Sequence, residues 1–323
     1  MTTDLSTPPA SAAASSRDGA LMRWFNARGW ADITIATPYL WLLIFFLVPF
    51  LIVVAMSLAT RTPTSPPFSF GVDGGGLDYS NFARLFQDDL YVRALITSVK
   101  NAALATILCL LVGYPMALGL TRVSRSSRNI LLMLVILPFW TSFLLRVYAW
   151  MGLMGNNSWF NRLLTGLWNS MTPEDWAVRS IQMMNTNFAV VLVTVYSYLP
   201  FMILPLYANL EKLDLTLNEA AMDLGSKPWR VFLDVTLPLS VPGIIAGGLL
   251  VFIPACGELI IPGLVGNPSQ PMIGRVISDE FGSARDWPMA SAVAVALLVL
   301  MVVPMMLYAH YDAKAQEKKA MEP

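Results

Sequence analysis

The sequence predicts an all-α membrane protein with six transmembrane helices, and three observations lead to this fold class. Of the 323 residues, 56% are hydrophobic and only 13% are charged, whereas an ordinary soluble domain has about 25% charged residues. Several apolar runs reach the length of about 20 residues that a helix needs to cross the hydrocarbon core. These runs lack the period-two alternation of a membrane β-barrel, which leaves helices as the spanning structure.

Six segments qualify as spans, and the fifth of them is interrupted by prolines and glycines. In chain order they are Ile33–Ala59, Leu95–Leu120, Ile130–Met151, Phe188–Leu210, Val241–Leu264 and Pro288–Ala309.

The charged residues indicate the orientation. The short loop after the second span holds Arg122, Arg125 and Arg128 and no acidic residue, which is typical of a cytoplasmic loop. Six alternating spans then place both termini in the cytoplasm. Residues 1–31, rich in Ser, Ala, Thr and Pro, are predicted to be a disordered cytoplasmic tail, 32–309 the transmembrane domain, and 310–323 a second cytoplasmic tail.

Composition also excludes several classes of function. The 21 basic and 21 acidic residues cancel, so no basic excess is present to bind nucleic acid. One histidine and two cysteines, the latter inside apolar runs, give no basis for a metal or redox site. A phosphate-binding P-loop is absent, as are the common hydrolase and metalloprotease motifs. We therefore expect no enzyme activity and no cofactor bound by this chain.

The predicted cytoplasmic loop 211–238 has the most specific pattern in the chain. Apolar residues at helical spacing predict a short helix. Gly225 is suited to a left-handed conformation that ends this helix, and Pro228 suits the first turn of the next one. Pro238 is predicted to end the second helix where the chain re-enters the membrane. We call this helix–turn–helix segment the elbow.

The elbow resembles the "EAA" loop of ABC-importer permeases, E-A-A-x-x-x-G-x(9)-I-x-L-P. Glu219, Ala220, Ala221, Gly225 and Pro238 match fixed positions of this pattern, and Val235 replaces its isoleucine. In that family the loop fits a groove on a cytoplasmic ATPase and transmits its closure to the spans. The resemblance therefore implies that these five matching residues contact the ATPase or act as a hinge.

Other stretches, such as NILLMLVILPFWTSFLLRVYAWMGL and GIIAGGLLVFIPACGELIIPGLVG, are similar to the putrescine/spermidine branch of these permeases. The resemblance implies a type I ABC importer permease in the bacterial inner membrane, surrounded by lipid. It further implies a second permease subunit, two ATPase subunits that use ATP, and a periplasmic substrate-binding protein. The imported solute is expected to be a polyamine, with putrescine favoured, moved by alternating access. The alternatives are a permease for another small organic ion and, less favoured, a gradient-driven secondary transporter.

Glu258 is the best candidate for a substrate contact, because ionisable residues inside spans are costly and tend to be functional. Prolines and glycines around it loosen the helix, and its carboxylate suits one ammonium group of a polyamine. The alternative, which we weigh equally, is a structural role, either as partner of Arg146 or in a polar network. Arg146 itself either pairs with Glu258 or extends to the outer surface.

Aromatic residues form a second set of candidates. Trp140, Tyr148 and Trp150 in the third span, and Trp41 in the first, are suited to cation–π contacts with a diamine. For each of them the belt of aromatic residues at a membrane surface, or simple packing, is the favoured explanation. Asp279, Glu280 and Asp286 in the outer loop could attract cations or dock a binding protein, but an ordinary solvated loop is the favoured explanation.

Overall fold

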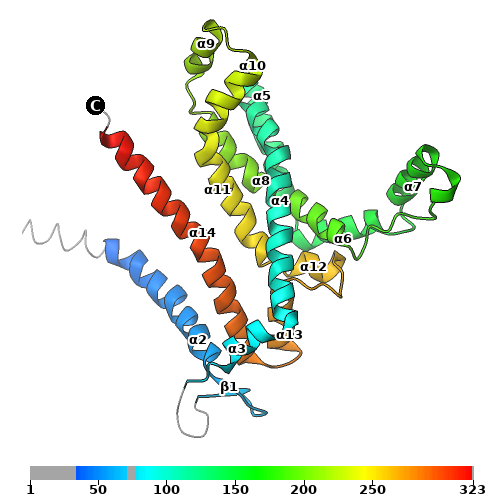
Figure 1. Cartoon of the computed structure of the whole chain (residues 1–323), viewed down its shortest axis with the longest axis vertical. Helices are drawn as coiled ribbons and strands as arrows, with labels where there is room; N and C mark the ends of the chain where they lie inside the picture. Colours follow the sequence, from blue (N-terminus) through cyan, green and yellow to red (C-terminus); the bar gives the residue numbers. More distant parts are fainter. Residues whose placement is uncertain (1–33, 71–76, 322–323) are drawn as a thin grey trace, which may run out of the picture. The chain divides into compact units, whose positions relative to one another are not determined.

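The computed structural model describes residues 34–70 and 77–321, and these are almost entirely helical. Two compact units are distinguished, residues 1–56 and residues 57–323. The expected disordered tail, residues 1–31, lies outside the described residues. Figure 1 shows the elements with the labels used below.

The first unit contains one apolar helix, Thr34–Ser57, which matches the first predicted span. It includes a π-helical stretch η1 (Leu43–Leu47) followed by α2 (Val48–Ser57). Large apolar side chains are exposed all along it, as expected for a helix surrounded by lipid.

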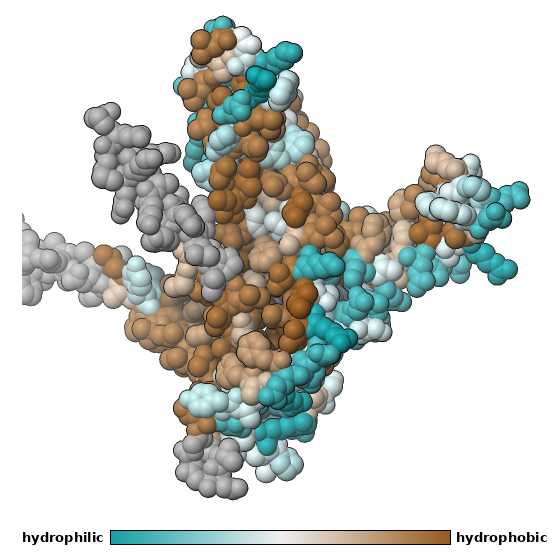
Figure 2. Space-filling view, viewed as in Figure 1, coloured by the Kyte–Doolittle hydropathy of each residue, from teal (hydrophilic) through white to brown (hydrophobic). Residues whose placement is uncertain are grey.

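Three long helices form the centre of the second unit: α4 (Asp89–Arg122), α8 (Asn187–Leu210) and α11 (Leu237–Cys256). Met202, Ile203, Leu206 and Val251 are fully or almost fully buried between them. α8 and α11 approach closely at Gly247, where a Cβ atom would lie 3.0 Å from the Met202 carbonyl oxygen. Small residues at such crossings allow two membrane helices to pack backbone to backbone. Figure 2 shows hydrophobic residues over the visible side of these helices and hydrophilic residues gathered around α9 and α10.

The third predicted span, Ile130–Met151, is broken instead of being one straight helix. It comprises α5 (Arg125–Ile136), a 3₁₀ turn η2 (Leu137–Trp140) and α6 (Phe143–Met154), with a bend of 90° between its two halves. Pro138 lies in the 3₁₀ turn and has no backbone N–H, so it cannot continue the α-helical hydrogen bonds. The sequence analysis overlooked this break.

Pro238 does not end a helix. The prediction that it ends the second helix of the elbow is therefore wrong. α10 (Pro228–Val231), the π-helical stretch η4 (Phe232–Thr236) and α11 form one continuous helix, Pro228–Cys256. The N–H of Leu237 reaches back five residues to the Phe232 carbonyl, and this wider turn accommodates the proline that follows. The elbow is therefore continuous with the apolar helix that follows it.

The fifth predicted span, Val241–Leu264, is broken near its end. α11 stops at Cys256, and α12 (Ile260–Val265) begins after a gap at Gly257–Leu259. The outer loop then forms α13 (Ile273–Gly282), and the chain continues as α14 (Trp287–Met321).

The described residues contain four helices that are long and apolar enough to span a membrane, or five if the bent α5–α6 pair counts as one span. The sixth predicted span, Pro288–Ala309, falls within α14, whose portion Trp287–Val302 is an apolar helix. Six spans and cytoplasmic termini stay predictions.

Smaller elements occupy residues 60–94 and 152–187, which follow the first and third predicted spans. In the first, the strands β1 (Thr60–Arg61) and β2 (Phe68–Ser69) pair antiparallel, with Thr60 opposite Ser69, and α3 (Ser80–Gln87) follows. The second contains α7 (Trp159–Met171) and the 3₁₀ turn η3 (Glu174–Trp176).

Asp286 does not lie in a solvated loop as expected. It is 1% exposed, its carboxylate lies 3.2 Å from Arg84 and 3.7 Å from Arg61, and it accepts a hydrogen bond from the Met289 N–H. It therefore ties the first outer loop to the start of α14.

Candidate functional site

The elbow has the helix–turn–helix geometry that its sequence predicts. α9 (Leu215–Asp223) ends at Gly225, whose φ of +85° is left-handed. The N–H of Gly225 donates to the Met222 carbonyl and that of Ser226 to the Ala221 carbonyl, which together form a Schellman motif. Pro228 then occupies the first turn of α10. The predicted conformations of Gly225 and Pro228 are thus confirmed.

The surface of the elbow carries apolar side chains that nothing in the described chain covers. Leu224 is 88% exposed, and Leu217, Met222 and Trp229 are about half exposed. Glu219 and Ala220 are exposed on the same helix, whereas Ala221 is half-buried. Several large exposed apolar side chains on one short segment are typical of a binding surface.

Two interactions fix the start of the elbow. Asp214 caps α9 by accepting a hydrogen bond from the Thr216 N–H at 3.0 Å. This backbone hydrogen bond, together with one from the Thr216 side chain, lowers the pKa of Asp214 below its usual value. Arg128 of α5 forms an ion pair of 2.7 Å with Glu211 and also donates to the Thr121 carbonyl. The α4–α5 loop is therefore tied to the elbow, beside a cavity of about 390 Å³.

Glu258 lies in the break between α11 and α12, and its side chain is buried. One carboxylate oxygen accepts hydrogen bonds from the N–H groups of Ile260 and Ile261, at 3.0 and 3.4 Å. The other accepts the hydroxyl of Tyr198, from α8, at 2.5 Å. The break thus provides free backbone donors for a carboxylate inside the apolar region. We call Glu258 and Tyr198 the break-site pair.

The outer loop packs directly against this break. A Cβ atom at Gly274, in the first turn of α13, would lie 2.5 Å from the Gly257 carbonyl oxygen and 2.8 Å from that of Glu258. The neighbouring Ile273 N–H donates to the Ser98 hydroxyl of α4 at 2.7 Å. α13 is therefore in main-chain contact with the break and is tied to α4.

Arg146 is buried in α6 and forms no ion pair with any residue that the structure describes, so the suggested pairing with Glu258 is not found. Its guanidinium lies 5.5 Å from the ring centres of both Phe139 and Phe143. It also lies near enough to interact electrostatically with the Tyr198 hydroxyl. Its Nε and Nη1 atoms have no hydrogen-bond partner within the described chain. The break-site pair therefore has a buried cation nearby that does not neutralise it by direct contact.

The four aromatic candidates are not gathered around Glu258. Trp140 and Tyr148 are exposed, as a lipid-facing aromatic belt requires. Trp150 packs edge-on against Tyr196 inside a hydrophobic cluster, and Trp41 stacks on Phe45 in the first unit. Among the described residues, Glu258 hydrogen-bonds to Tyr198 and to none of these four side chains.

Tyr198 is the site residue that the sequence analysis missed. It lies in an apolar helix, two residues before Pro200. A buried tyrosine hydroxyl needs a hydrogen-bond partner, and this need was the one feature of the sequence that could have pointed to Tyr198.

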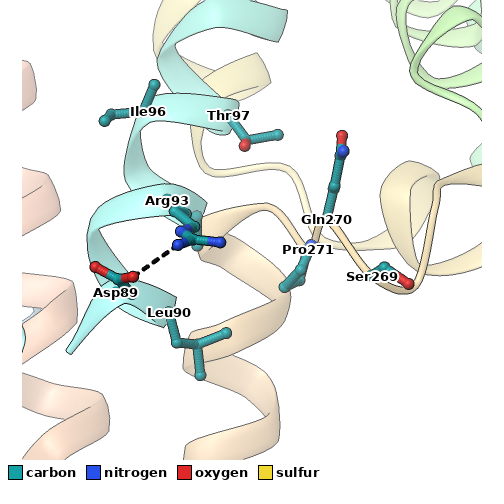
Figure 3. Close-up of a pocket in the computed structure, with 9 residues that line it drawn as sticks. Asp89, Leu90, Arg93, Ile96, Thr97, Ser269, Gln270 and Pro271 are labelled. Carbon is teal, nitrogen blue, oxygen red and sulfur yellow. Dashed lines mark hydrogen bonds and ion pairs between the residues drawn. The ribbon is translucent and has the colours of Figure 1, made fainter.

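A second, polar cavity of about 540 Å³ lies between the first turns of α4 and the loop before α13 (Figure 3). Asp89 and Arg93 line it and pair with each other at 2.6 Å. Gln270, on the opposite wall, accepts a hydrogen bond from Asn187 at the start of α8. Its charged groups neutralise each other, so this cavity offers no unbalanced charge to a solute.

Residues 109–317 match the family described as "Binding-protein-dependent transport system inner membrane component". The chain belongs to this family. The match includes the elbow and the break-site pair, so both lie in the part of the chain that defines a permease of this kind. The protein is therefore a multi-pass inner-membrane transport subunit, and its relatives are transport permeases rather than enzymes.

Individual relatives agree with this permease family. The chain is 39% identical over 290 residues to "Spermidine/putrescine transport system permease protein PotB" of Haemophilus influenzae, which covers 90% of this chain and 96% of the relative. It is 36% identical over 283 residues to the Escherichia coli protein of the same name, covering 87% and 98%. Among solved structures, a bacterial alginate ABC transporter in complex with an alginate pentasaccharide-bound periplasmic protein has a TM-score of 0.67 at 17% identity, covering 90% of this chain and 97% of that one. The last similarity shows that the fold is that of an ABC importer permease.

Proposed function

We propose that this permease moves a polyamine, most favourably putrescine, into the cytoplasm by ATP-driven alternating access. The names of the curated relatives support the solute class. We further propose that the working transporter contains a second permease, two ATPase subunits that bind and hydrolyse ATP, and a periplasmic substrate-binding protein. The family's dependence on a binding protein supports the last of these partners.

The break-site pair is the observation that carries the proposal for the solute. A buried carboxylate that accepts hydrogen bonds from a tyrosine hydroxyl and two backbone N–H groups is held in one orientation, because these three donors engage both of its oxygens. An ammonium group that reaches it exchanges water for a charge-assisted hydrogen bond in a medium of low dielectric constant. Glu258 is the proposed ligand of one ammonium, and Tyr198 positions it.

The unpaired guanidinium of Arg146 has a consequence for how a diamine lies. A fixed cation within reach of the Tyr198 hydroxyl repels a second ammonium at the same place. The break site therefore accepts one end of the diamine, and the other end points away from α6. We propose that this arrangement selects an elongated dication over a compact one.

The elbow supports the proposed coupling to ATP. Its exposed apolar surface suits a groove on an ATPase, and its second helix continues into α11 without interruption. Because α11 ends at the break that holds Glu258, a rotation of the elbow is transmitted along one helix to the proposed ammonium site. Glu219, Ala220, Ala221 and Gly225 are the proposed contact and hinge residues.

The test is uptake of radiolabelled putrescine by the complete transporter reconstituted in proteoliposomes, with Glu258→Gln compared with Glu280→Gln. Glu280 is a matched control, because it also accepts a tyrosine hydroxyl, that of Tyr91 at 2.7 Å, but lies in α13 outside the break. Replacing a charged acceptor by a neutral one costs about 1–2 kcal/mol per hydrogen bond. We therefore expect KM to rise about 5- to 30-fold for Glu258→Gln, since 1.4 kcal/mol is a factor of about ten.

Glu280→Gln is expected to transport normally. Unchanged uptake by Glu258→Gln would remove Glu258 from the site, and an equal loss in both variants would indicate a general structural effect. Uptake that continues without ATP and follows an ion gradient would contradict the importer proposal itself.

A further inference from the structure

Helix α7 and the elbow are joined to opposite ends of α8: the segment after α7 leads into Asn187, and the elbow follows Leu210. The ion pair between Arg128 and Glu211 places the α4–α5 loop beside the elbow, and the chain then runs away from it through α5 and α6 before α7 begins (Figure 1). Ser158 caps α7 by accepting a hydrogen bond from the Asn161 N–H at 2.9 Å. α7 is thus a well-formed helix in an extramembrane loop, and it has two different faces.

One face of α7 is fixed by hydrogen bonds to the chain segment that follows it. Asn161, Thr165 and Asn169 are spaced four residues apart and therefore lie along one side of the helix. The Ile181 N–H donates to Asn161 and Thr165, both at 3.2 Å, and Asn169 exchanges two hydrogen bonds of 3.0 Å with the backbone of Val178. This strapping segment, residues 177–181, sets the rotation of α7 about its own axis.

A second stripe on α7 is apolar and exposed. Trp159, Leu163, Leu167 and Met171 are again four residues apart, and they are 67%, 53%, 47% and 82% exposed. The strapping segment occupies the polar side of α7, so rotation of the helix cannot bury this stripe. Phe160 and Leu164, between the two faces, pack against a hydrophobic cluster of the second unit. We call the four exposed residues the α7 stripe.

The chemistry around the α7 stripe fits lipid better than a protein partner. Protein interfaces carry about one hydrogen bond per 100–200 Å². The polar side chains of α7, however, are already bonded within the chain: Arg162 to Asn157, Ser170 to Leu167, and the Trp168 indole to Trp176. Trp159, Trp168 and Trp176 are all exposed, and tryptophan is typical of the boundary between headgroups and acyl chains.

The α7 stripe follows directly after a broken membrane helix that also exposes apolar side chains. α6 leads directly to α7, and its Leu144, Leu145 and Tyr148 are 44%, 62% and 54% exposed in a broken membrane span. We propose that α7 is an amphipathic helix bound in the headgroup region of the outer leaflet, with the α7 stripe inserted among the lipids. It anchors the loop after α6 in the plane of the membrane, whichever solute the permease carries.

The test measures the surroundings of two positions on the same helix. Leu167→Cys places a spin label on the stripe, and Arg162→Cys is the control: Arg162 is exposed, and the five residues that separate it from Leu167 turn it about 140° round the helix axis. The native cysteines, Cys109 and Cys256, are both buried, so the label goes to the introduced thiol. The complete transporter, with cysteine-free partner subunits, is placed in nanodiscs of phosphatidylethanolamine and phosphatidylglycerol. Collisions of the label with oxygen and with a water-soluble nickel chelate are then measured.

We expect the ratio of oxygen to nickel collisions to be several-fold higher at position 167 than at 162, with Leu163→Cys one turn earlier behaving like Leu167→Cys. Equal access of nickel to both positions would place the stripe in water and overturn the proposal. An immobilised label at 167 that neither reagent reaches would place it against a protein subunit, which also overturns it. Uptake is measured for each variant, so that the labels are compared only in transporters that remain folded and active.

Discussion

Gly247 lies where α11 crosses α8, and the two backbones meet there with nothing between them. A Cβ atom at this position would lie 2.9 Å from Sδ, 3.0 Å from the carbonyl oxygen and 3.3 Å from Cα of Met202. The Met202 side chain can rotate away, but its carbonyl and Cα cannot, so Gly247→Ala must separate the two helices by several tenths of an ångström. Overpacking of this kind costs about 1–3 kcal/mol, which changes the ratio of folded to unfolded protein about 5- to 150-fold.

The neighbouring Gly248 gives the matched control. Its Cβ position lies 3.8 Å from the Thr106 side chain, an ordinary van der Waals distance, so Gly248→Ala is expected to be neutral or slightly stabilising. Both variants are heated in detergent, and the fraction that stays monodisperse is followed by size-exclusion chromatography. Gly247→Ala should lose this fraction at a clearly lower temperature. If the two variants melt together, the close crossing is not a constraint on this fold and the reasoning is wrong.

The elbow supports two further predictions. Gly225→Ala places a side chain at a φ of +85° with no atom within 4 Å, so its cost is that of the left-handed backbone alone, about 1–2 kcal/mol. We expect this variant to transport fewer solute molecules per ATP hydrolysed. Gly225→Asn should reduce this ratio less, because asparagine tolerates the left-handed conformation. Asp214→Ala should speed hydrogen exchange in the first turn of α9, whereas Asp214→Asn should not at neutral pH. The hydrogen bonds from Thr216 lower the pKa of Asp214, so the stabilisation of α9 by its carboxylate is complete above the unfolded-state pKa and is lost as pH falls through the lower folded-state pKa. Hydrogen-exchange rates of the wild type, corrected for their intrinsic pH dependence, should show this loss. The rates of Asp214→Asn should not.

The sequence predicted the features that depend on neighbouring residues. Gly225 and Pro228 have the expected conformations because glycine and proline act on their own backbone angles. The prediction for Pro238 was wrong because the effect of a proline depends on the turn before it. Here that turn is π-helical, with the Leu237 N–H bonded to the Phe232 carbonyl, and the helix continues through the proline. The break at Pro138 was missed for a related reason, since an apolar run shows length but not bends.

The candidate site could be predicted only in part. Glu258 was recognisable because a carboxylate in an apolar run is rare, but Tyr198 lies 60 residues away along the chain and only folding brings the two together. The four aromatic candidates were chosen by residue type, and the structure distributes them among an exposed surface, a hydrophobic cluster and the first unit. Residue type does not determine which side of a helix faces the break.

The contact of Gly274 with the carbonyls of Gly257 and Glu258 joins main chain to main chain. A displacement of α13 therefore presses on the two peptide groups that flank Glu258, with no side chain as intermediary. An alanine scan, which removes side chains one at a time, would leave this route intact and report the outer loop as unimportant. Substitutions that add volume at position 274, or that replace the amide of Ile273 by an ester, are the ones that can detect it.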